Sequence, residues 1–300
     1  MAYGIGIFIA ERISAAVVSN NAITAPLIDF PEDHSISDAL HAVPAEGIVK
    51  QIVELVEKLN LKDPPSHVGI GMPGIVRNGI IEDSPNLIQL KGANMKALVE
   101  AELARIVGAA PVEVFNDADA VAAGLAATRG QLDRLIRVWT LGNGIGYGRY
   151  PFREGVWEAG HTVVTLDPKE HYCGCGGRGH LEGIMGHRSM RLRFMDMEPD
   201  EIFEHAKAGD TRCMDFVKRW HRALAAATAT NIHLDGPGKF YITGFNARFV
   251  NPSLLLEYLN EMVKLSPLQG YSIEVVQGSE EAATIGASVN AAQAVNRQQA

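Results

Sequence analysis

The stretch PVEVFNDADAVAAGLAA, residues 111–127, combines the pattern of a strand and that of a helix with no linker between them. Val112, Val114 and Phe115 lie in a short apolar run between proline and asparagine, which predicts a buried strand. From Asp117 onward the stretch is rich in alanine, which has the highest helix propensity, and this predicts a helix. A strand that continues directly into a helix is typical of layered α/β proteins, so this stretch indicates an α/β fold.

The same alternation continues on both sides of this stretch. Toward the N-terminus we expect strands at 3–9 and 13–18 joined by a turn at 10–12, a helix at 45–59, strands at 67–71 and 79–82, and a helix at 94–107. Toward the C-terminus we expect two strands around a glycine-rich turn near residue 143, helices near 199–207, 211–232, 252–264 and 280–298, and strands at 240–243 and 272–276. This order favours mostly parallel sheets, to which hairpins add antiparallel strands.

The order of these elements also predicts two α/β domains. The expected boundary follows the strand that ends at Asn116, so residues 1–116 form the N-terminal domain and residues 117–284 the C-terminal domain. The last helix, residues 285–300, is expected to pack back on the N-terminal domain.

Composition excludes several classes of protein. The chain of 300 residues carries a net charge of −8, which argues against a nucleic-acid-binding protein because such proteins need a basic surface. Its apolar runs are far shorter than the ~20 residues of a membrane span, and the N-terminus does not read as a signal peptide. Three cysteines do not form a disulfide framework. We therefore expect a cytoplasmic protein with neither nucleic-acid nor membrane partners.

The stretch HYCGCGGRGHLE, which begins at His171, holds two of the three cysteines. With His161 upstream, Cys173, Cys175 and His180 make a set of two thiols and two imidazoles, which suits tetrahedral zinc. The glycines of the stretch would let the backbone fold around an ion. A flexible surface loop with spare thiols is the alternative interpretation, and His171 is a competing ligand.

Two further segments point to phosphate chemistry. Asp117 lies between a strand and a helix, where it either caps the helix or, with Asn116 beside it, faces a substrate. In the second case the carboxylate could take a proton from a hydroxyl that attacks phosphorus. The segment LGNGIGYG has glycine at positions 142, 144, 146 and 148, and such a turn brings backbone amides close to a phosphate or to another backbone.

These motifs occur in a fixed order along the chain. The order is GxPG (Gly71–Gly74), PN (Pro85-Asn86), NDA (Asn116–Ala118), GNGIG (Gly142–Gly146), ExGH (Glu158–His161), then CxCG with a trailing LE (Cys173–Glu182). Together they resemble the ROK family, which contains sugar kinases and sugar-responsive repressors. The resemblance covers nearly the whole chain and implies a two-lobed actin/hexokinase-like (ribonuclease H-like) α/β fold, with mixed sheets flanked by helices and the sugar in the cleft between lobes. Because the first strand begins at residue 3, we expect the kinase branch, without the repressors' DNA-binding domain.

The resemblance also implies roles for individual residues. The enzyme would transfer a phosphoryl group from ATP to a hydroxyl of a hexose or hexose derivative, as a glucokinase does, with Asp117 as general base. Residues that would bind the sugar are Gly74, Asn86, Asn116, Asp117, Glu158, His161 and Glu182. A structural zinc would be held by His161, Cys173, Cys175 and His180, where His180 replaces the third cysteine of the family. Magnesium would accompany ATP, and a homodimer is compatible with the resemblance.

The half that would bind the phosphoryl donor departs from the family pattern. ROK kinases begin with DxGGTK, whereas this chain reads GIFIAERIS, with Phe8 in place of the aspartate that helps position magnesium. Candidate donor-binding residues that remain are Arg12, Gly142, Asn143, Gly144 and Gly244. The family's usual threonine is replaced at Asn143, and TGFNARF keeps only the first glycine of another motif. A donor other than ATP and a non-catalytic sugar-binding protein are therefore the alternatives.

Overall fold

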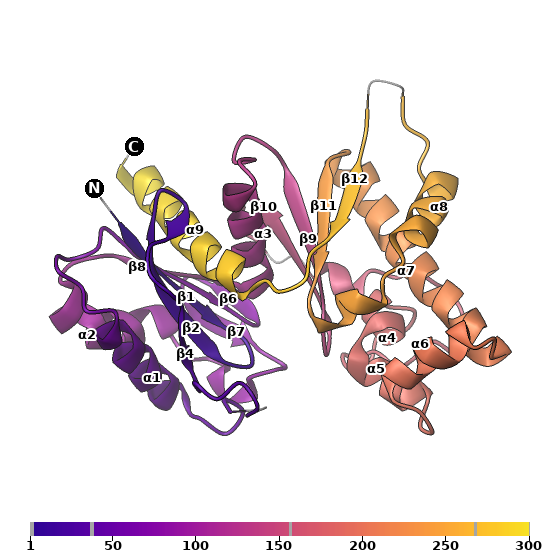
Figure 1. Ribbon diagram of the computed structural model, residues 1–300, viewed down its shortest axis with the longest axis horizontal. Coiled ribbons are helices and arrows are strands. Elements are labelled where there is room, and N and C mark those ends of the chain that lie inside the picture. Colours follow the sequence, from indigo (N-terminus) through magenta and orange to yellow (C-terminus); the bar gives the residue numbers. More distant parts are fainter. Residues whose placement is uncertain (1–2, 37–38, 156–157, 267–268, 300) are drawn as a thin grey trace. The chain divides into compact units, whose positions relative to one another are not determined.

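The computed structural model describes residues 3–36, 39–155, 158–266 and 269–299 (Figure 1). The chain divides into two compact units. Unit 1 comprises Met1–Ile136, Gly148–Val156 and Ser279–Ala300, and unit 2 comprises Arg137–Tyr147 and Trp157–Gly278. This division differs from the boundary expected after Asn116, because helix α3 (Asp117–Thr128) packs within unit 1 against the last helix, α9 (Glu280–Gln299).

Among the described residues, unit 1 contains a mixed six-stranded sheet in the order β3-β2-β1-β5-β8, with β4 also paired to β2. The strands are β1 (Gly4–Ile9), β2 (Ile13–Ser19), β3 (Ala22–Ile23), β4 (Ile28–Phe30), β5 (Val68–Met72) and β8 (Val112–Asn116). β1, β5 and β8 are parallel, whereas β2 is antiparallel to β1. A separate hairpin joins β6 (Ile75–Arg77) to β7 (Ile80–Asp83).

One face of this sheet is covered by α1 (Ala45–Lys58) and α2 (Met95–Val107). Their buried residues form one apolar cluster with the strands, which includes Ile5, Ile7, Ile48, Ile52, Val99 and Leu103. The buried residues of α1, the helix expected at 45–59, therefore face the sheet. Asn94 is the N-cap of α2, because its side chain accepts a hydrogen bond from the N–H of Ala97 at 3.0 Å.

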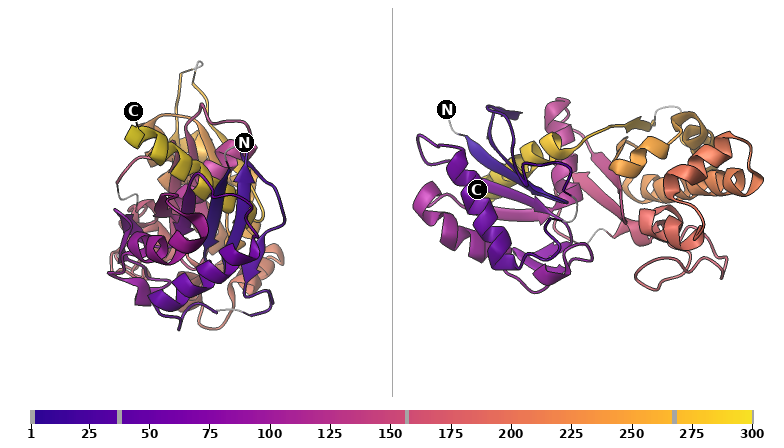
Figure 2. Two further views of the ribbon diagram at one scale, coloured as in Figure 1. Left: turned by 90° about the vertical axis from the view of Figure 1, so that its left-hand side faces the viewer. Right: turned by 60° about the horizontal axis from the view of Figure 1, so that its bottom comes forward.

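On the other face, α9 packs against β1 and β5 (Figure 2). A Cβ atom on Gly6 would lie 1.9 Å from the carbonyl oxygen of Thr284, and one on Gly69 would lie 1.9 Å from that of Ala287. No side chain fits at such distances, so the glycines let helix and strand backbones touch.

Unit 2 is built on a sheet in the order β10-β9-β11-β12, as far as its described residues show. Its strands are β9 (Ile136–Leu141), β10 (Ile145–Tyr150), β11 (Lys239–Thr243) and β12 (Ser272–Val275), and β11 and β12 are parallel. Its helices are α4 (Leu181–Met185), α5 (His187–Arg193), α6 (Pro199–Lys207), α7 (Thr211–Asp235) and α8 (Pro252–Met262).

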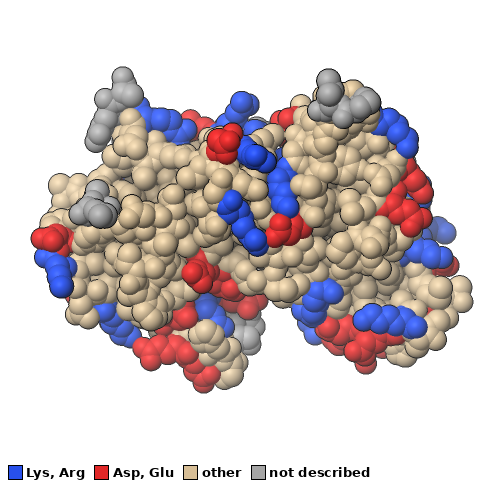
Figure 3. All heavy atoms as spheres, turned by 45° about the horizontal axis from the view of Figure 1, so that its top comes forward, with Lys and Arg blue, Asp and Glu red and all other residues tan. Residues whose placement is uncertain are grey.

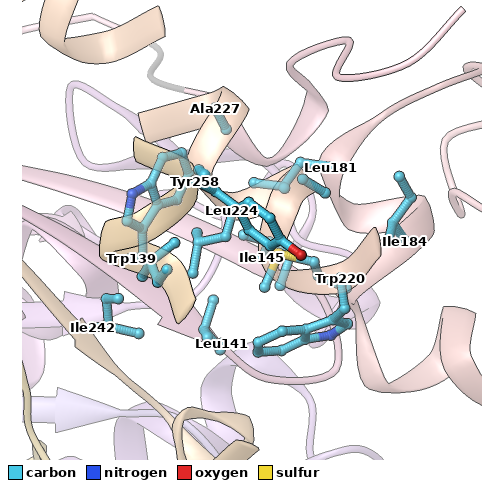
Figure 4. Packing of buried hydrophobic residues seen from close by; sticks show 14 of the residues in the cluster. Trp139, Leu141, Ile145, Leu181, Ile184, Trp220, Leu224, Ala227, Ile242 and Tyr258 are labelled. Carbon is cyan, nitrogen blue, oxygen red and sulfur yellow. The ribbon is translucent and has the colours of Figure 1, made fainter. Parts of the chain in front are cut away.

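The core of unit 2 is an apolar cluster between this sheet and the helices (Figure 4). Trp139 and Trp220 are fully buried in it, and the indole N–H of Trp139 donates to the hydroxyl of Thr228 at 3.1 Å. Leu181 and Ile184 of α4 belong to the same cluster. Burial of these two residues anchors the short helix that follows the Cys/His segment.

The helices of the described residues offer no apolar stretch long enough to cross a membrane. Figure 3 shows one face of the molecule, on which basic and acidic side chains lie in small mixed groups among larger uncharged areas.

The contact between α9 and the sheet leads to a stability prediction. Gly69→Ala should lower the free energy of unfolding by about 1–3 kcal/mol or more, because the added methyl group collides with backbone that cannot move independently. Gly270→Ala is the matched control, since no atom lies within 4 Å of its Cβ position, and it should change stability by less than about 0.5 kcal/mol. Urea unfolding measures both, and equal effects of the two substitutions would contradict the steric explanation.

Candidate functional site

The side chains of His161, Cys173, Cys175 and His180 come together in unit 2, with ligand atoms within 4.8 Å of one another. The Cys173 sulfur lies 3.4 Å from His161 Nδ1 and 3.4 Å from the Cys175 sulfur, which in turn lies 3.2 Å from His180 Nδ1. Metal–ligand bonds of about 2.0–2.3 Å in a tetrahedron separate the ligand atoms by about 3.3–3.8 Å. The three separations given are close to this range, so the four side chains can close around one tetrahedral metal ion.

The competing ligand His171 lies outside this cluster. Its ring stacks on Tyr172 with ring centroids 4.7 Å apart. The loop can close around His180 because residue 177 is glycine. A Cβ atom on Gly177 would lie 2.0 Å from the His180 ring.

The protonation state of the cluster would depend on whether a cation is bound. Burial raises the pKa of the Cys173 thiol to about 12, so without a metal ion this thiol stays protonated at neutral pH. Burial also lowers the pKa of His180, which favours the neutral imidazole that binds metals. A divalent cation would displace the thiol proton, so metal binding and deprotonation are coupled.

Two carboxylates lie beside the cluster. Glu158 Oε2 is 3.5 Å from His161 Nε2, so the two ring nitrogens of His161 face different groups. Glu182, in the first turn of α4, accepts a hydrogen bond from the N–H of Ile145 at 3.0 Å, and its other oxygen lies 3.6 Å from the Cys173 sulfur.

A buried ion-pair network holds the start of the Cys/His segment. Glu170 is only 4% exposed and accepts hydrogen bonds from Arg193 and, at 2.7 Å, from Arg219. The Arg193 guanidinium also lies over the Tyr172 ring, 4.3 Å from its centroid. The segment is therefore fixed to α5 and α7 by charge and stacking as well as by its cluster.

The glycine-rich turn between β9 and β10 is held from two sides. The carbonyl oxygens of Gly142 and Asn143 accept from the N–H groups of His187 at 3.0 Å and Arg188 at 3.4 Å, at the start of α5. Asn246 donates to the same Gly142 oxygen at 3.2 Å and bonds the His187 ring at 3.1 Å.

Gly244 and the residue after it lie next to this turn. Gly244 has φ of +92°, and a Cβ there would lie 2.4 Å from the Leu141 carbonyl oxygen, which explains why this glycine is kept. The ring of Phe245 stands edge-on to that of His187, with centroids 5.2 Å apart, and contacts the Cβ position of Gly142 at 3.4 Å. An aromatic ring thus borders the turn where the resemblance predicted glycine.

In unit 1, Asn116 and Asp117 lie at the junction of β8 and α3. The Asn116 side chain accepts from the N–H of Ala118 at 2.9 Å and donates to the carbonyl oxygen of Gly74 at 2.9 Å. Asp117 is half-buried, and its carboxylate also lies 2.9 Å from the Ala118 N–H. Asn116 therefore links the start of α3 to the GxPG turn, while Asn86 is exposed farther along that segment.

Comparison with known proteins identifies the chain. The model of the ROK family matches residues 30–294. The chain belongs to the ROK family. The match begins beyond β1 and β2, so the divergent GIFIAERIS segment lies outside it.

Two curated relatives and one solved structure illustrate this membership. The chain is 27% identical over 237 residues to a glucokinase of Pyrobaculum calidifontis, covering 74% of this chain and 77% of that protein. It is 26% identical over 231 residues to an N-acetylmannosamine kinase of Haemophilus influenzae, covering 71% and 70%. A ROK hexokinase of Thermus thermophilus superposes with a TM-score of 0.79 at 21% identity, over 98% of this chain and 99% of that one. The predicted actin/hexokinase-like fold is confirmed.

The divergent part of this ROK protein is integrated into its core. Phe8 is buried, and it pairs across the sheet with Ser14, which in turn pairs with Asp29. Ser14 donates to Asp29 at 2.6 Å, and His34 lies 3.1 Å from the other Asp29 oxygen. Asp29 thus lies in the same row of paired residues as Phe8. Its carboxylate already contacts the Ser14 hydroxyl and the His34 imidazole.

Three other charged residues differ in exposure. Arg12 donates to the carbonyl oxygen of His34 at 3.3 Å, and its second terminal nitrogen is buried with no hydrogen-bond partner among the described residues. Glu11 is exposed, whereas Asp119 is buried and accepts from the N–H of Arg149 at 2.9 Å.

His187, Asn246 and Glu170 support the site but carry no signal in the sequence. His187 and Asn246 are 59 residues apart, and Glu170 and Arg219 are 49 apart. Only the folded chain brings such pairs together.

Burial of Asp119 predicts a pH-dependent stability. Burial raises the pKa of Asp119 to about 7 from its usual 3.8, so between these values the folded state keeps a proton that the unfolded state has lost. Stability contributed by this group is therefore present at pH below about 4, falls as the pH rises, and is lost above about pH 7. Asp119→Asn, which keeps an acceptor oxygen but cannot ionise, should raise the urea midpoint more at pH 8 than at pH 5 and should change it little below about pH 4.

The exposed Asp133→Asn serves as the control and should leave the pH dependence unchanged. If Asp119→Asn shifts the midpoint equally at both pH values, ionisation of Asp119 is not the cause.

Proposed function

We propose that this ROK protein is a sugar kinase that transfers a phosphoryl group to a hydroxyl of a hexose or hexose derivative, with Asp117 as general base. The observation that carries the assignment is the Asn116–Asp117 pair at the β8–α3 junction, fixed to the GxPG turn by the bond from Asn116 to Gly74. The activities for which the relatives are named, glucokinase and N-acetylmannosamine kinase, support the substrate class.

The chemistry requires a carboxylate at the acceptor hydroxyl. As the hydroxyl oxygen attacks phosphorus, its O–H bond breaks and the proton passes to Asp117. The bond from phosphorus to the bridging oxygen of the donor breaks in the same step, and its electron pair stays with the donor. Asn116 holds the backbone beside Asp117, so the base is positioned before the sugar arrives.

Polar groups from motifs early and late in the sequence, from GxPG to the trailing LE, would bind the sugar hydroxyls. The proposed set is Gly74, Asn86, Asn116, Asp117, Glu158, His161 and Glu182. Glu158 is half-exposed beside His161, so its carboxylate can accept from hydroxyls.

Zinc is the ion that best suits the Cys/His cluster. Two thiolates and two neutral imidazoles, contributed by His161, Cys173, Cys175 and His180, match its preference for a tetrahedral sulfur and nitrogen shell. Four protein ligands leave no position for water, so the ion would be structural and would not activate a nucleophile. Its role would be to fix the His161 ring and thereby Glu158.

The donor is proposed to be ATP with magnesium, bound through the turn at Gly142, Asn143 and Gly144, with Gly244 and Arg12. A donor other than ATP is the second candidate, because Phe8 occupies the position of the magnesium-organising carboxylate and Phe245 borders the turn. A non-catalytic sugar-binding protein is the third. We further propose a cytoplasmic location and small-molecule partners, with a homodimer as the assembly.

A kinase assay tests this function. The protein should form phosphosugar from glucose, mannose, hexosamines or N-acetylhexosamines with MgATP or polyphosphate. Asp117→Asn should reduce kcat about 10²–10⁴-fold while the sugar still raises the melting temperature, because the amide keeps the shape but accepts no proton.

Asp133→Asn, an exposed carboxylate in the loop after α3, is the matched control and should retain activity. If no donor yields phosphosugar while sugars still raise the melting temperature, the non-catalytic alternative replaces the kinase. Loss of sugar binding together with turnover in Asp117→Asn would count against its role as base.

Metal analysis tests the cluster. The purified protein should contain about one zinc per chain, and His180→Ala should lower that content because three ligands remain. His171→Ala should keep the zinc, since its ring stacks on Tyr172 outside the cluster. A zinc content near zero in the wild-type protein, or loss of zinc in His171→Ala instead, would overturn the assignment.

A further inference from the structure

Glu182 contacts both the Cys/His cluster and the glycine-rich turn. Its Oε2 accepts from the backbone N–H of Ile145 at 3.0 Å, directly after the turn. Its Oε1 lies 3.6 Å from the sulfur of Cys173. One carboxylate oxygen therefore bonds the turn, and the other lies beside the cluster.

The turn is shaped to admit this carboxylate. A Cβ on Gly144 would lie 2.5 Å from Glu182 Oε2 and 3.2 Å from the carboxyl carbon. Any side chain at this position would displace Glu182 from Ile145. One glycine of the turn is therefore required by Glu182, independently of any phosphate.

The helix that carries Glu182 is itself fixed by the cluster. Its N-cap is His180, two residues before Glu182. A Cβ on Gly183 would lie 3.0 Å from the backbone nitrogen of Cys173, so the first turn of α4 rests against the Cys173 backbone. Whatever fixes Cys173 and His180 therefore also fixes the direction of the Glu182 side chain.

Helix α4 contacts the turn at its other end as well. Gly186 follows α4, and a Cβ there would lie 2.9 Å from the Asn143 carbonyl oxygen. The next residue, His187, donates its N–H to the Gly142 oxygen at 3.0 Å. The turn is thus held at Ile145 by the start of α4 and at Gly142 and Asn143 by the residues after it.

We propose that Glu182 couples the metal cluster to the glycine-rich turn, so that metal binding orders the backbone of residues 142–145. This inference rests on the proposed function only in the use of the turn for the phosphoryl donor. It assigns Glu182 a positioning role, and it makes the cluster a determinant of the donor side as well as of the sugar side.

The energetic reason is the strength of the bond to Ile145. A hydrogen bond from a backbone N–H to a charged carboxylate is stronger than a neutral one, and its loss leaves a partly buried donor unsatisfied. When the cluster loses its ion, the segment around Cys173 and His180 is no longer cross-linked, so the Glu182 side chain loses this support even though Leu181 and Ile184 keep α4 in the core. Local opening of the turn should then become more frequent.

Hydrogen–deuterium exchange of the whole protein tests the coupling without substrates. Removing zinc with a chelator should speed exchange in the peptide covering residues 141–147 by about tenfold or more in the wild-type protein. In Glu182→Ala with zinc bound, this peptide should already exchange fast, and the chelator should add little. Glu182→Gln keeps an acceptor oxygen and should restore slow exchange at least in part.

Glu158→Ala is the matched control, because Glu158 also contacts the cluster through His161 but makes no hydrogen bond to the turn among the described residues. It should respond to the chelator as the wild-type protein does. The coupling is overturned if the chelator leaves this peptide unchanged in the wild-type protein, if it acts equally in Glu182→Ala, or if the protein takes up no metal.

These outcomes are separable from the kinase assay. Coupled exchange in a protein that makes no phosphosugar would refute the proposed activity and keep the role of Glu182. Phosphosugar formation without coupled exchange would do the reverse.

Discussion

The fold of unit 1 depends on direct contact between helix and strand backbones. Gly6 and Gly69 lie under α9, and Gly124 and Gly286 lie between α3 and α9, with Cβ positions 1.6–1.9 Å from carbonyl oxygens. A layer this close cannot tolerate a methyl group, and it leaves α3 little freedom to move. Because Asp117 is the first residue of α3, this steric constraint also determines where the proposed base lies. The same packing places α3 in unit 1.

In unit 2 the Cys/His cluster lies on a loop, so it is not fixed by backbone contact between a helix and a strand. The Cys/His segment contributes few apolar side chains to the core, so it is held by specific polar contacts. Glu170 joins it to two arginines, and Leu181 and Ile184 anchor its end in the apolar cluster. A metal ion among the four ligands would add the remaining cross-links. The polar side chains that we propose to bind a sugar could then remain solvent-accessible without losing their order.

The sequence predicted the long elements well and the short ones poorly. The helix at 199–207 and the strand-to-helix change at Asp117 agree with the structure because each has a strong local pattern. The two-residue β3 and the five-residue α4 were missed, since periodicity cannot be read over so few residues. The four metal-ligand candidates do cluster, as expected from glycine-rich spacing. The contacts of Asn246 with His187 and of Glu182 with Ile145 could not be predicted, because they depend on how distant segments pack.

The retained and altered parts of the ROK pattern differ in how they are built into the chain. Asn116 and Glu182 each make one contact within their own motif and one to another motif, so their loss would disturb the fold around them. Phe8, an altered position of the pattern, is also built into the core. Its ring lies 3.4 Å from the Cβ position of Gly71, in the layer beneath α9. A carboxylate at that position would be buried there without the glycines and threonine that accompany it in ROK kinases. In the proposed function, recognition of the donor phosphates would therefore depend more on Arg12 and on the turn at 142–144 than it does in those kinases. We have proposed that Glu182 couples that turn to the Cys/His cluster. The proposed metal ion would therefore order the donor side of the site, where the sequence departs most from the family pattern.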